Sequence, residues 1–243
     1  MFGLGTIVNV ITILIGGMIG LVLKRYLSAR ITETVMQGVG LAVVIIGISG
    51  ALSAIYTVID GNIVSDHILI MIISLAVGAL IGELLNIEGK LDIFAKLCER
   101  KFTKPEETST FTQGFVTATL VFCVGSMAIV GALEDGINRN SDILFAKSAL
   151  DGITAAIFAS TLGVGVLFSA VAVGVYQGTL TLLSVFIAPY LSDVIITQMS
   201  FIGSVLIMSI GFNLLKITKI KVGNLLPAIF IPVVYYMIRF FIF

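Results

Sequence analysis

The stretch Leu4–Leu23, LGTIVNVITILIGGMIGLVL, contains no charged residue and is followed directly by Lys24 and Arg25. As an α-helix, about 20 largely apolar residues cover about 30 Å, the thickness of the hydrocarbon core of a bilayer. The run is longer than the apolar core of a secretory signal, about 7–15 residues, and no cleavage site of small residues precedes Lys24. We therefore expect it to be a first membrane span that stays in the protein.

The composition of the whole chain has the same character as this stretch. Of its 243 residues, 58% are hydrophobic and 12% are charged, and the mean hydropathy is +1.15. A soluble domain carries about 25% charged residues, so this chain could not cover itself with a hydrated surface. The formal net charge of zero gives no indication of a nucleic-acid partner. The composition predicts an integral membrane protein whose main partner is the lipid bilayer.

Apolar runs separated by charged or turn-rich segments predict eight membrane helices. The expected ranges are 4–23, 37–56, 68–86, 113–133, 144–166, 171–191, 198–215 and 225–242. The glycine-rich stretch 144–191 fits either two spans or a broken helix followed by a shorter one. The predicted fold class is all-α, a polytopic transmembrane bundle of about eight helices. It forms a single domain over 1–243, with broken helices and internal repeats left open.

Lysine and arginine alternate between the expected loops, which predicts the orientation. They gather after the first, third and seventh helices, and the loops 57–67 and 132–143 contain almost none. Short loops rich in lysine and arginine remain on the cytoplasmic side. With eight spans, both termini then lie outside. An odd number of crossings between 113 and 215 would break this alternation.

The basic loop after the third helix has an amphipathic pattern. Ile87, Leu91, Phe94 and Cys98 recur at helical spacing, and charged residues fall on the opposite face. This pattern predicts an interfacial helix over 87–102 that lies on the cytoplasmic leaflet. A solvated connector is the alternative.

Three segments that precede basic loops resemble one another. They are 16–23, 78–85 and 210–215. Glycines four residues apart, at Gly16 and Gly20 and at Gly78 and Gly82, allow helix backbones to approach closely. An internal repeat, as in many transporters, and a chance likeness of apolar helices are both open. The same glycine faces leave a homodimer open.

Motifs for nucleotide-driven, metal or nucleophilic chemistry are missing from the sequence. It has no GxxxxGK[ST], no HExxH and no GxSxG. The single histidine, His67, is expected in a loop at the edge of a span. Cys98 and Cys123 lack metal-ligand spacing, and we expect two free thiols. We therefore expect no enzyme and no cofactor, and leave a metal undecided.

Lys147 and Asp151 are the strongest candidates for a functional site within a span. A charge at the centre of a membrane helix costs about 2.5–3.5 kcal/mol on insertion scales, so such a residue suggests function by default. The two residues are four apart and share one helical face, which Thr154 extends. Asp151 could bind a cation or proton while Lys147 sets its charge state. Alternatively, the pair lies near the interface and orients the helix.

Two glycine-containing segments, Gly125–Gly131 and Ser160–Gly165, could interrupt neighbouring helices. Backbone groups exposed at a break within a span can coordinate ions, whereas close helix packing is the alternative reading. We expect Ser126 to shape a binding site together with the glycines at the breaks. These glycines are Gly125, Gly131, Gly163 and Gly165.

Asn9 in the first helix and Asn213 in the seventh complete the candidate binding residues. A buried amide without a hydrogen-bond partner costs about 2–7 kcal/mol. Each asparagine is therefore expected to bind either a ligand or a neighbouring helix.

Several of these segments occur together in a known family. They are Gly125–Gly131 followed by Glu134-Asp135-Gly136, then Lys147–Gly152, Ala159–Gly165, Tyr176-Gln177-Gly178 and Gly223–Pro227. In combination they resemble the YdfK/YqgA-like family of uncharacterised bacterial inner-membrane proteins, catalogued as a domain of unknown function. The resemblance covers most of the chain and is densest from 113 to 227. It implies a bacterial cytoplasmic (inner) membrane location and carries over no activity.

The intramembrane carboxylate beside helix-breaking glycines favours one function. We predict a secondary transporter or channel-like permease for an ion or small solute. The alternative is a non-transporting membrane scaffold, sensor or partner subunit. The expected partners are the bilayer and a small solute or ion, with no nucleic acid.

Overall fold

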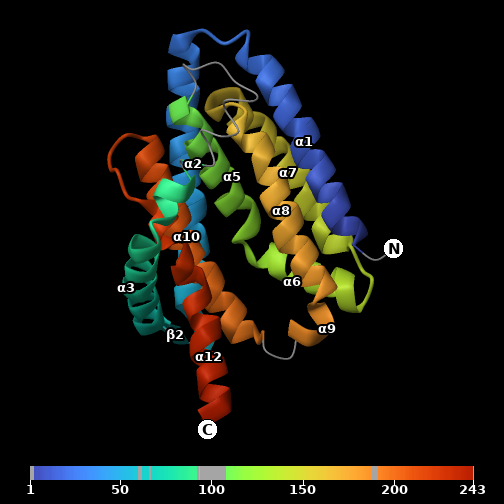
Figure 1. The fold of residues 1–243 in the computed structure, drawn as a ribbon, viewed down its shortest axis with the longest axis vertical. Coiled ribbons are helices and arrows are strands. Elements are labelled where there is room, and N and C mark those ends of the chain that lie inside the picture. The colour runs from blue at the N-terminus through green and yellow to red at the C-terminus, as the bar shows by residue number, and fades with distance from the viewer. Residues whose placement is uncertain are drawn as a thin grey trace. The chain divides into compact units, whose positions relative to one another are not determined.

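The computed structural model describes residues 3–59, 62–65, 67–91, 93, 108–187 and 191–242. In this part of the chain the regular elements are helices and one short two-stranded sheet (Figure 1). The elements are α1 (Leu4–Lys24), α2 (Ala29–Ile55), β1 (Tyr56–Ile59), β2 (Asn62–Ser65), α3 (Ile68–Leu85), α5 (Thr108–Cys123), α6 (Ser126–Ile137), α7 (Asp142–Leu162), α8 (Gly165–Leu182), α9 (Ser184–Ile187), α10 (Asp193–Leu214), α11 (Val222–Leu225), η3 (Leu226–Phe230) and α12 (Ile231–Ile242).

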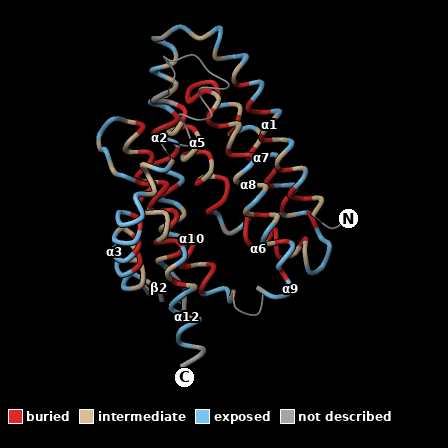
Figure 2. The backbone as a smooth tube through the Cα atoms, in the orientation of Figure 1, coloured by how far each residue is buried: buried red, intermediate tan, exposed pale blue. Residues whose placement is uncertain are grey.

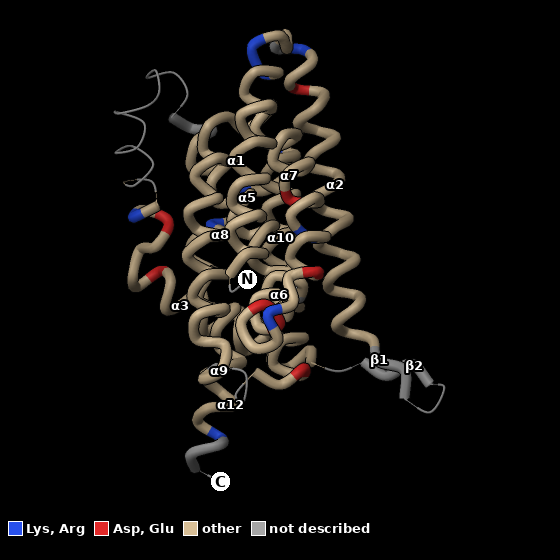
Figure 3. The backbone as a smooth tube through the Cα atoms, turned by 90° about the vertical axis from the view of Figure 1, so that its right-hand side faces the viewer, with Lys and Arg blue, Asp and Glu red and all other residues tan. Residues whose placement is uncertain are grey.

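Seven helices of the described chain are long and apolar enough to cross a membrane: α1, α2, α3, α7, α8, α10 and the segment from α11 to α12. The pair α5 and α6 passes the same test together but is bent by 58° at its junction. Lys and Arg gather at the turn between α1 and α2, while most of the length of the helices carries no charge (Figure 3). The chain is an all-α polytopic membrane protein, as its composition predicted.

The chain folds into two compact units. Unit 1 comprises Met1–Val39 and Gly89–Ile187, and holds α1 and α5 to α9. Unit 2 comprises Gly40–Glu88 and Ala188–Phe243, and holds β1, β2, α3, α10, α11, η3 and α12. Helix α2 contributes its first residues to unit 1 and the remainder to unit 2.

Within unit 1, α1 and α7 lie side by side and run in the same direction (Figure 1). Gly5 of α1 packs on Leu144, and Gly20 packs on Ala156. The residue numbers of the contacting positions therefore increase in the same direction along both helices, which makes the helices parallel. Two membrane helices run parallel only when an odd number of crossings separates them. Since α2 and α3 each cross once, the bent pair α5–α6 must also cross once. We infer that it is one broken span, which gives eight spans in the part of the chain that the structure describes.

Unit 2 supports the same count independently. Gly40 of α2 packs near Leu215 and Gly50 near Ser204, so α2 and α10 run in opposite directions. The segment α11–η3 likewise runs opposite to α3. Both directions would be reversed if α5–α6 entered and left the membrane on one side. An even number of spans places the two termini on the same side, and the prediction that this side is the outside stays a prediction.

The predicted glycine faces do bring backbones together, within each unit. A Cβ on Gly16 would collide with the carbonyl oxygen of Gly152 on α7, and one on Gly82 with the carbonyl oxygen of Asn224 on α11. Close packing of this kind associates membrane helices, because lipid tails are as apolar as the helices themselves. The chain's own helices therefore cover these faces, and the homodimer stays a prediction that would need another surface.

The spans of unit 2 differ in how far they are enclosed. In α10, 72% of the apolar window is buried, against 17% in α3. Figure 2 shows this contrast as a mostly buried α10 beside a mostly exposed α3. Helix α10 therefore forms the core of unit 2, and much of the surface of α3 is available to lipid.

The observed helices differ from the predicted ranges by a few residues at most ends, and three differences matter for the fold. Helix α2 begins at Ala29 rather than at 37. Its first turns carry Arg30 and Glu33, whose side chains are exposed, so the helix can extend beyond the apolar run without burying a charge. The range 113–133 is the bent pair α5–α6. The range 171–191 corresponds to α8, which begins at Gly165 and ends at Leu182.

The predicted break at 160–165 is the turn between two spans. Gly17 of α1 packs on Leu167, and Gly174 packs on Val10, so α8 runs opposite to α1 and hence to α7. Gly163 has φ 80° and ψ −156°, a conformation that essentially only glycine adopts. The stretch 144–191 therefore holds two spans, the first of the two alternatives that its sequence allowed.

Two loops complete the fold. The loop predicted over 57–67 contains strands β1 and β2, which pair antiparallel with Ile59 opposite Asn62. The intervening sequence Asp60-Gly61 is a common signal for a two-residue hairpin. Of the interfacial helix predicted over 87–102, the structure describes only 87–91 and 93, and Cys98 lies outside the described residues.

Candidate functional site

Lys147 and Asp151 form an ion pair on one face of α7, through Lys147 Nζ and Asp151 Oδ2. The two residues are 5% and 6% exposed. Asp151 is the tenth of the 21 residues of α7. It therefore lies about 14 Å along the axis from the start of the helix, close to its middle. This depth favours the intramembrane reading of the pair over the interfacial one.

An amide from another helix bonds to the ion pair, and a second amide bonds to the first. Asn9 of α1 donates from Nδ2 to Asp151 Oδ2 at 3.0 Å and to Gln177 Oε1 of α8 at 3.2 Å. Both amides are fully buried. We call Asn9, Lys147, Asp151 and Gln177 the Asp151 cluster. Because three helices supply its members, the cluster exists only when α1, α7 and α8 are packed together.

An aromatic ring lies on the other side of Lys147. Its Nζ is 5.9 Å from the centroid of the Phe122 ring on α5, within the range of a cation–π contact. Phe122 in turn stacks on Phe158 at a centroid distance of 6.3 Å. Helix α5 ends at Cys123, so the bend between α5 and α6 follows Phe122 directly. The Lys147 ammonium thus lies between two groups, the Asp151 carboxylate and this ring.

Four buried polar atoms in or beside the cluster have no hydrogen-bond partner among the described residues. They are Thr6 Oγ1, Asn9 Oδ1, Gln177 Nε2 and Thr181 Oγ1. Thr6 is three residues from Asn9 on α1, and Thr181 is four from Gln177 on α8, so each threonine shares a helix face with its amide. A buried polar group left unsatisfied costs about 1–3 kcal/mol. Such groups are usually bonded to ordered water or a ligand.

A pocket opens beside the same two threonines. It has a volume of about 410 Å³, lies between α1 and α8, and is lined by Thr6, Thr181, Val10 and Gly174 among others. Small-molecule sites commonly measure about 300–1,000 Å³. The unsatisfied atoms therefore form a row on α1 and α8 that begins in this pocket and ends at the Asp151 cluster.

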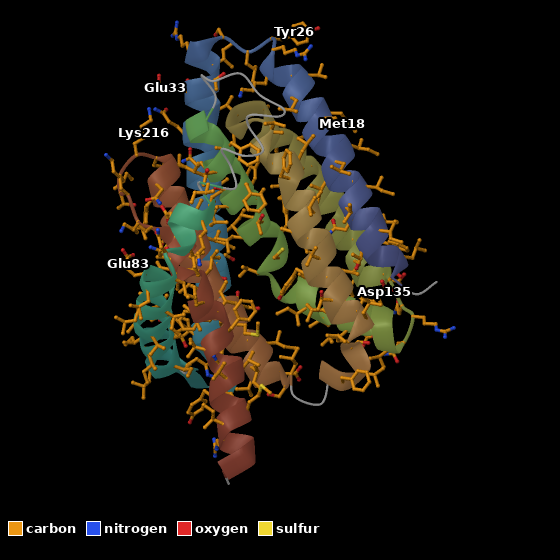
Figure 4. The ribbon with its side chains drawn as sticks, in the orientation of Figure 1. Met18, Tyr26, Glu33, Glu83, Asp135 and Lys216 are labelled. Atoms are coloured by element: carbon orange, nitrogen blue, oxygen red, sulfur yellow. The ribbon has the colours of Figure 1, made fainter. Side chains whose placement is uncertain are left out.

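Asp135 is a buried carboxylate that the sequence analysis did not single out. It is fully buried, and accepts hydrogen bonds from the Gly5 backbone N–H at 3.2 Å and from the Ser141 hydroxyl at 2.8 Å. Figure 4 shows it beside the beginning of α1. A carboxylate at a helix N-terminus is favourable, so Asp135 joins α6 to the starts of α1 and α7. The sequence Glu134-Asp135 does not reveal which carboxylate points inward.

The remaining predicted residues of unit 1 have different places. Ser126 is the first residue of α6, and its side chain lies outside the described part. Thr154 is half-buried, one turn beyond Asp151. Gly131 packs on Leu144.

The two other glycines act in different ways. Gly165 packs on the carbonyl oxygen of Phe111, which joins α8 to α5. Gly125 has φ −64° and ψ 146°, values open to any residue, so the bend before α6 does not depend on glycine.

Asn213 belongs to unit 2 and has a structural role there. Its Nδ2 donates to the Ile220 carbonyl at 2.8 Å, and its Oδ1 accepts from the Thr218 hydroxyl and the Ile220 N–H. These bonds close the loop that follows α10. Asn213 is therefore not part of the Asp151 cluster. No group of three or more metal-ligating side chains is found among the residues that the structure describes.

The fold and the buried cluster define the class of this protein, a polytopic integral membrane protein with an ion pair in the middle of a span. The chain belongs to the family described as "Protein of unknown function (DUF554)", whose model matches residues 4–237. This confirms the resemblance seen in the sequence.

Two relatives extend over nearly the whole chain. "Uncharacterized membrane protein YdfK" of Bacillus subtilis (strain 168) is 33% identical over 244 residues, covering 98% of this chain and 97% of the relative. "Uncharacterized protein YqgA" of Escherichia coli (strain K12) is 30% identical over 230 residues, covering 93% of each. No solved structure matches the chain significantly.

Proposed function

We propose that this protein is a secondary transporter or channel-like permease for an ion or small solute, and that Asp151 is the carboxylate that binds it. The observation that carries the proposal is the Asp151 cluster in the middle of α7. Ionisable residues at this depth are costly, and in membrane proteins they mark ion and substrate pathways.

The surroundings of the cluster support a path to it. The row of unsatisfied polar atoms on α1 and α8 leads from the pocket at Thr6 and Thr181 to Asn9 and Gln177. If these polar groups served only to bond helices together, we would expect each atom to have a partner, because an unpaired polar group inside the membrane lowers the stability of the fold. A hydrated solute moving between α1 and α8 would meet a partner at each of these positions.

The geometry gives Lys147 a competing role. Its ammonium occupies Asp151 Oδ2, the position that a bound cation would take. The Phe122 ring, 5.9 Å from Lys147 Nζ, offers the ammonium a second place when it leaves the carboxylate. In the proposed mechanism, a cation or proton binds Asp151 as Lys147 moves away, and release of the cation restores the ion pair.

The test is a thermal-shift screen of the purified protein in dodecylmaltoside against sodium, potassium and lithium chloride, amino acids and carboxylates at constant ionic strength. We expect a saturable stabilisation by one ligand, followed by flux of that ligand in proteoliposomes. Asp151→Asn should abolish both effects. Asp142→Asn is the matched control, because Asp142 is an exposed carboxylate in the first turn of the same helix.

Ligand stabilisation that survives Asp151→Asn would contradict the role of Asp151. No stabilisation by any compound would favour the alternative, a non-transporting scaffold, sensor or partner subunit. A subunit of this kind could dock through the Gly16/Gly20 and Gly78/Gly82 faces, but these faces already pack on other helices inside the two units.

A further inference from the structure

Unit 2 contains a second pocket, of about 480 Å³, where α3, α10 and α12 meet. One end is polar, formed by His67, Gln198 and Tyr236, and its walls include Leu69, Ile73 and Ile231. His67 was expected in a loop. Its backbone does precede α3, in a left-handed conformation with φ 68°, but its ring faces Gln198. We call this cavity the His67 pocket.

Gln198 is the centre of the polar end and is only 4% exposed. Its Nε2 lies 3.1 Å from His67 Nδ1 and donates to the Tyr236 hydroxyl at 3.4 Å. Its Oε1 is buried and has no hydrogen-bond partner among the described residues. A buried amide oxygen in this state is an acceptor that a ligand can satisfy.

The polar end presents one acceptor and one donor. Gln198 Oε1 accepts, and the Tyr236 oxygen, having accepted from Gln198, keeps its own O–H to donate. A hydroxyl group both donates and accepts, so it complements this pair. The residues described as lining the pocket include no Lys, Arg, Asp or Glu. Apart from His67, a charged head group would therefore meet no ionisable side chain among these residues, whereas a hydroxyl meets both the acceptor and the donor.

The rest of the pocket fits a hydrocarbon chain. Its walls come from apolar membrane helices, and Leu69, 72% exposed, stands at the rim on α3. At about 30 Å³ for a group the size of a water molecule, 480 Å³ holds roughly 16 such groups. This is the size of a short-chain lipid with a small head.

We propose that the His67 pocket binds a neutral amphiphile from the membrane, with its hydroxyl head at Gln198 and Tyr236 and its chain against Leu69 and Ile73. The site belongs to unit 2 and is independent of the Asp151 cluster in unit 1.

The test uses 1-decanoylglycerol, a neutral amphiphile of this size, and the full-length protein in phosphatidylcholine nanodiscs. Binding is measured with the radiolabelled compound. We expect saturable binding of one molecule per chain, and at least tenfold weaker binding of methyl decanoate, which has the same chain but no hydroxyl. Equal affinity for the two compounds, or binding that does not saturate, would overturn the proposal.

Variants locate the binding site. Gln198→Leu should weaken binding at least tenfold, and Tyr236→Phe, which removes the donor, by about threefold. Ser204→Ala on the same helix is the control, because its hydroxyl bonds to the Ser200 carbonyl of its own helix. Asp151→Asn should leave binding unchanged, which separates this site from the proposed transport site.

Leu69→Trp keeps the test decisive if Gln198→Leu fails to fold. Leu69 is exposed, so a larger side chain there fills the mouth of the pocket without disturbing the core. It should abolish binding of 1-decanoylglycerol while the size-exclusion profile stays that of the wild type. Unchanged binding in Leu69→Trp would place the ligand elsewhere and refute the proposal.

Discussion

The two units place their polar groups differently. In unit 1, Asn9 donates hydrogen bonds to Asp151 and to Gln177 on two other helices, at the middle of a span. In unit 2, the buried hydroxyls of Ser204 and Ser209 bond to the backbone of their own helix, and Gln198, whose side chain does bond between helices, is uncharged and contacts no charged pair among the described residues. Both units nevertheless use glycines to bring helix backbones into contact. Packing is thus a shared means of holding the helices together, whereas the mid-span charge is a property of unit 1 that stability alone does not require.

The largest expected effect is the removal of one partner of the buried ion pair. Lys147→Met leaves Asp151 buried without its countercharge, which should lower the free energy of unfolding by about 3–5 kcal/mol. The measurement is the unfolding midpoint as sodium dodecyl sulfate is titrated into dodecylmaltoside micelles, followed by far-ultraviolet circular dichroism. The double variant Lys147→Met/Asp151→Leu should recover most of the loss. A single variant as stable as the wild type would show that the pair is not buried as described.

The next effect tests the feature that the two units share. Gly16→Ala and Gly82→Ala each place a methyl group against a backbone carbonyl, so each should destabilise by about 1–3 kcal/mol through overpacking. Gly125→Ala is the control, since nothing lies within 4 Å of its added Cβ and its φ is negative. The same detergent titration measures all three. A loss in only one unit would contradict shared packing by glycine.

A smaller effect is expected at the brace formed by Asp135. Ser141→Ala removes the hydroxyl that donates to Asp135 Oδ1, and leaves that buried oxygen without a partner. The expected loss is about 1–3 kcal/mol, towards the lower end because Oδ2 keeps its bond to Gly5 N–H. Ser209→Ala, which removes a hydroxyl bonded only to its own helix, is the comparison in unit 2. If the two variants lost equal stability, a hydroxyl that bonds between helices would contribute no more than one that bonds within its own helix.

The smallest effect belongs to the charged pair of unit 2. Lys221 Nζ and Glu83 Oε1 are 3.0 Å apart, but both side chains are more than half exposed. Exposed pairs are screened by water and salt and contribute little. Lys221→Ala should leave the unfolding midpoint within the error of the wild type. A clear fall in the unfolding midpoint would mean that exposed charges at helix ends stabilise unit 2, so that charge pairs would contribute to stability in both units.

The sequence predicted the membrane spans and the packing faces better than the site. The spans could be predicted from the length of the apolar runs, and the close packing at Gly16 and Gly82 from small residues four positions apart. Both signals are local in the sequence. The Lys147–Asp151 pair was also local, four residues apart on one helix. Its depth and its buried state came only from the structure.

The partners of Asp151 could not be predicted, because they depend on which helices pack together. Asn9 was a candidate, but its bond to Asp151 joins residues 142 positions apart. Gln177 was not among the candidate binding residues, since the start of α8 could not be placed within the glycine-rich stretch 144–191. Asn213 was proposed for the same site by residue type alone, although its polar atoms close a loop in unit 2. One sequence contains no signal that pairs distant amides with one carboxylate.

The order of synthesis gives the Asn9–Asp151 bond a further consequence. Helix α1 leaves the ribosome first, but its partners lie on α7 and α8. Until Asp151 has been inserted, Asn9 stays in the membrane without either of the groups that later bond to it, and its set of partners is complete only once Gln177 has followed. Newly made α1 should therefore remain beside the insertion machinery, and site-specific crosslinks from α1 to that machinery should fall only in nascent chains that extend past α8. Assembly of unit 1 is thus a late event in the biogenesis of this protein, although its first helix is made at the start.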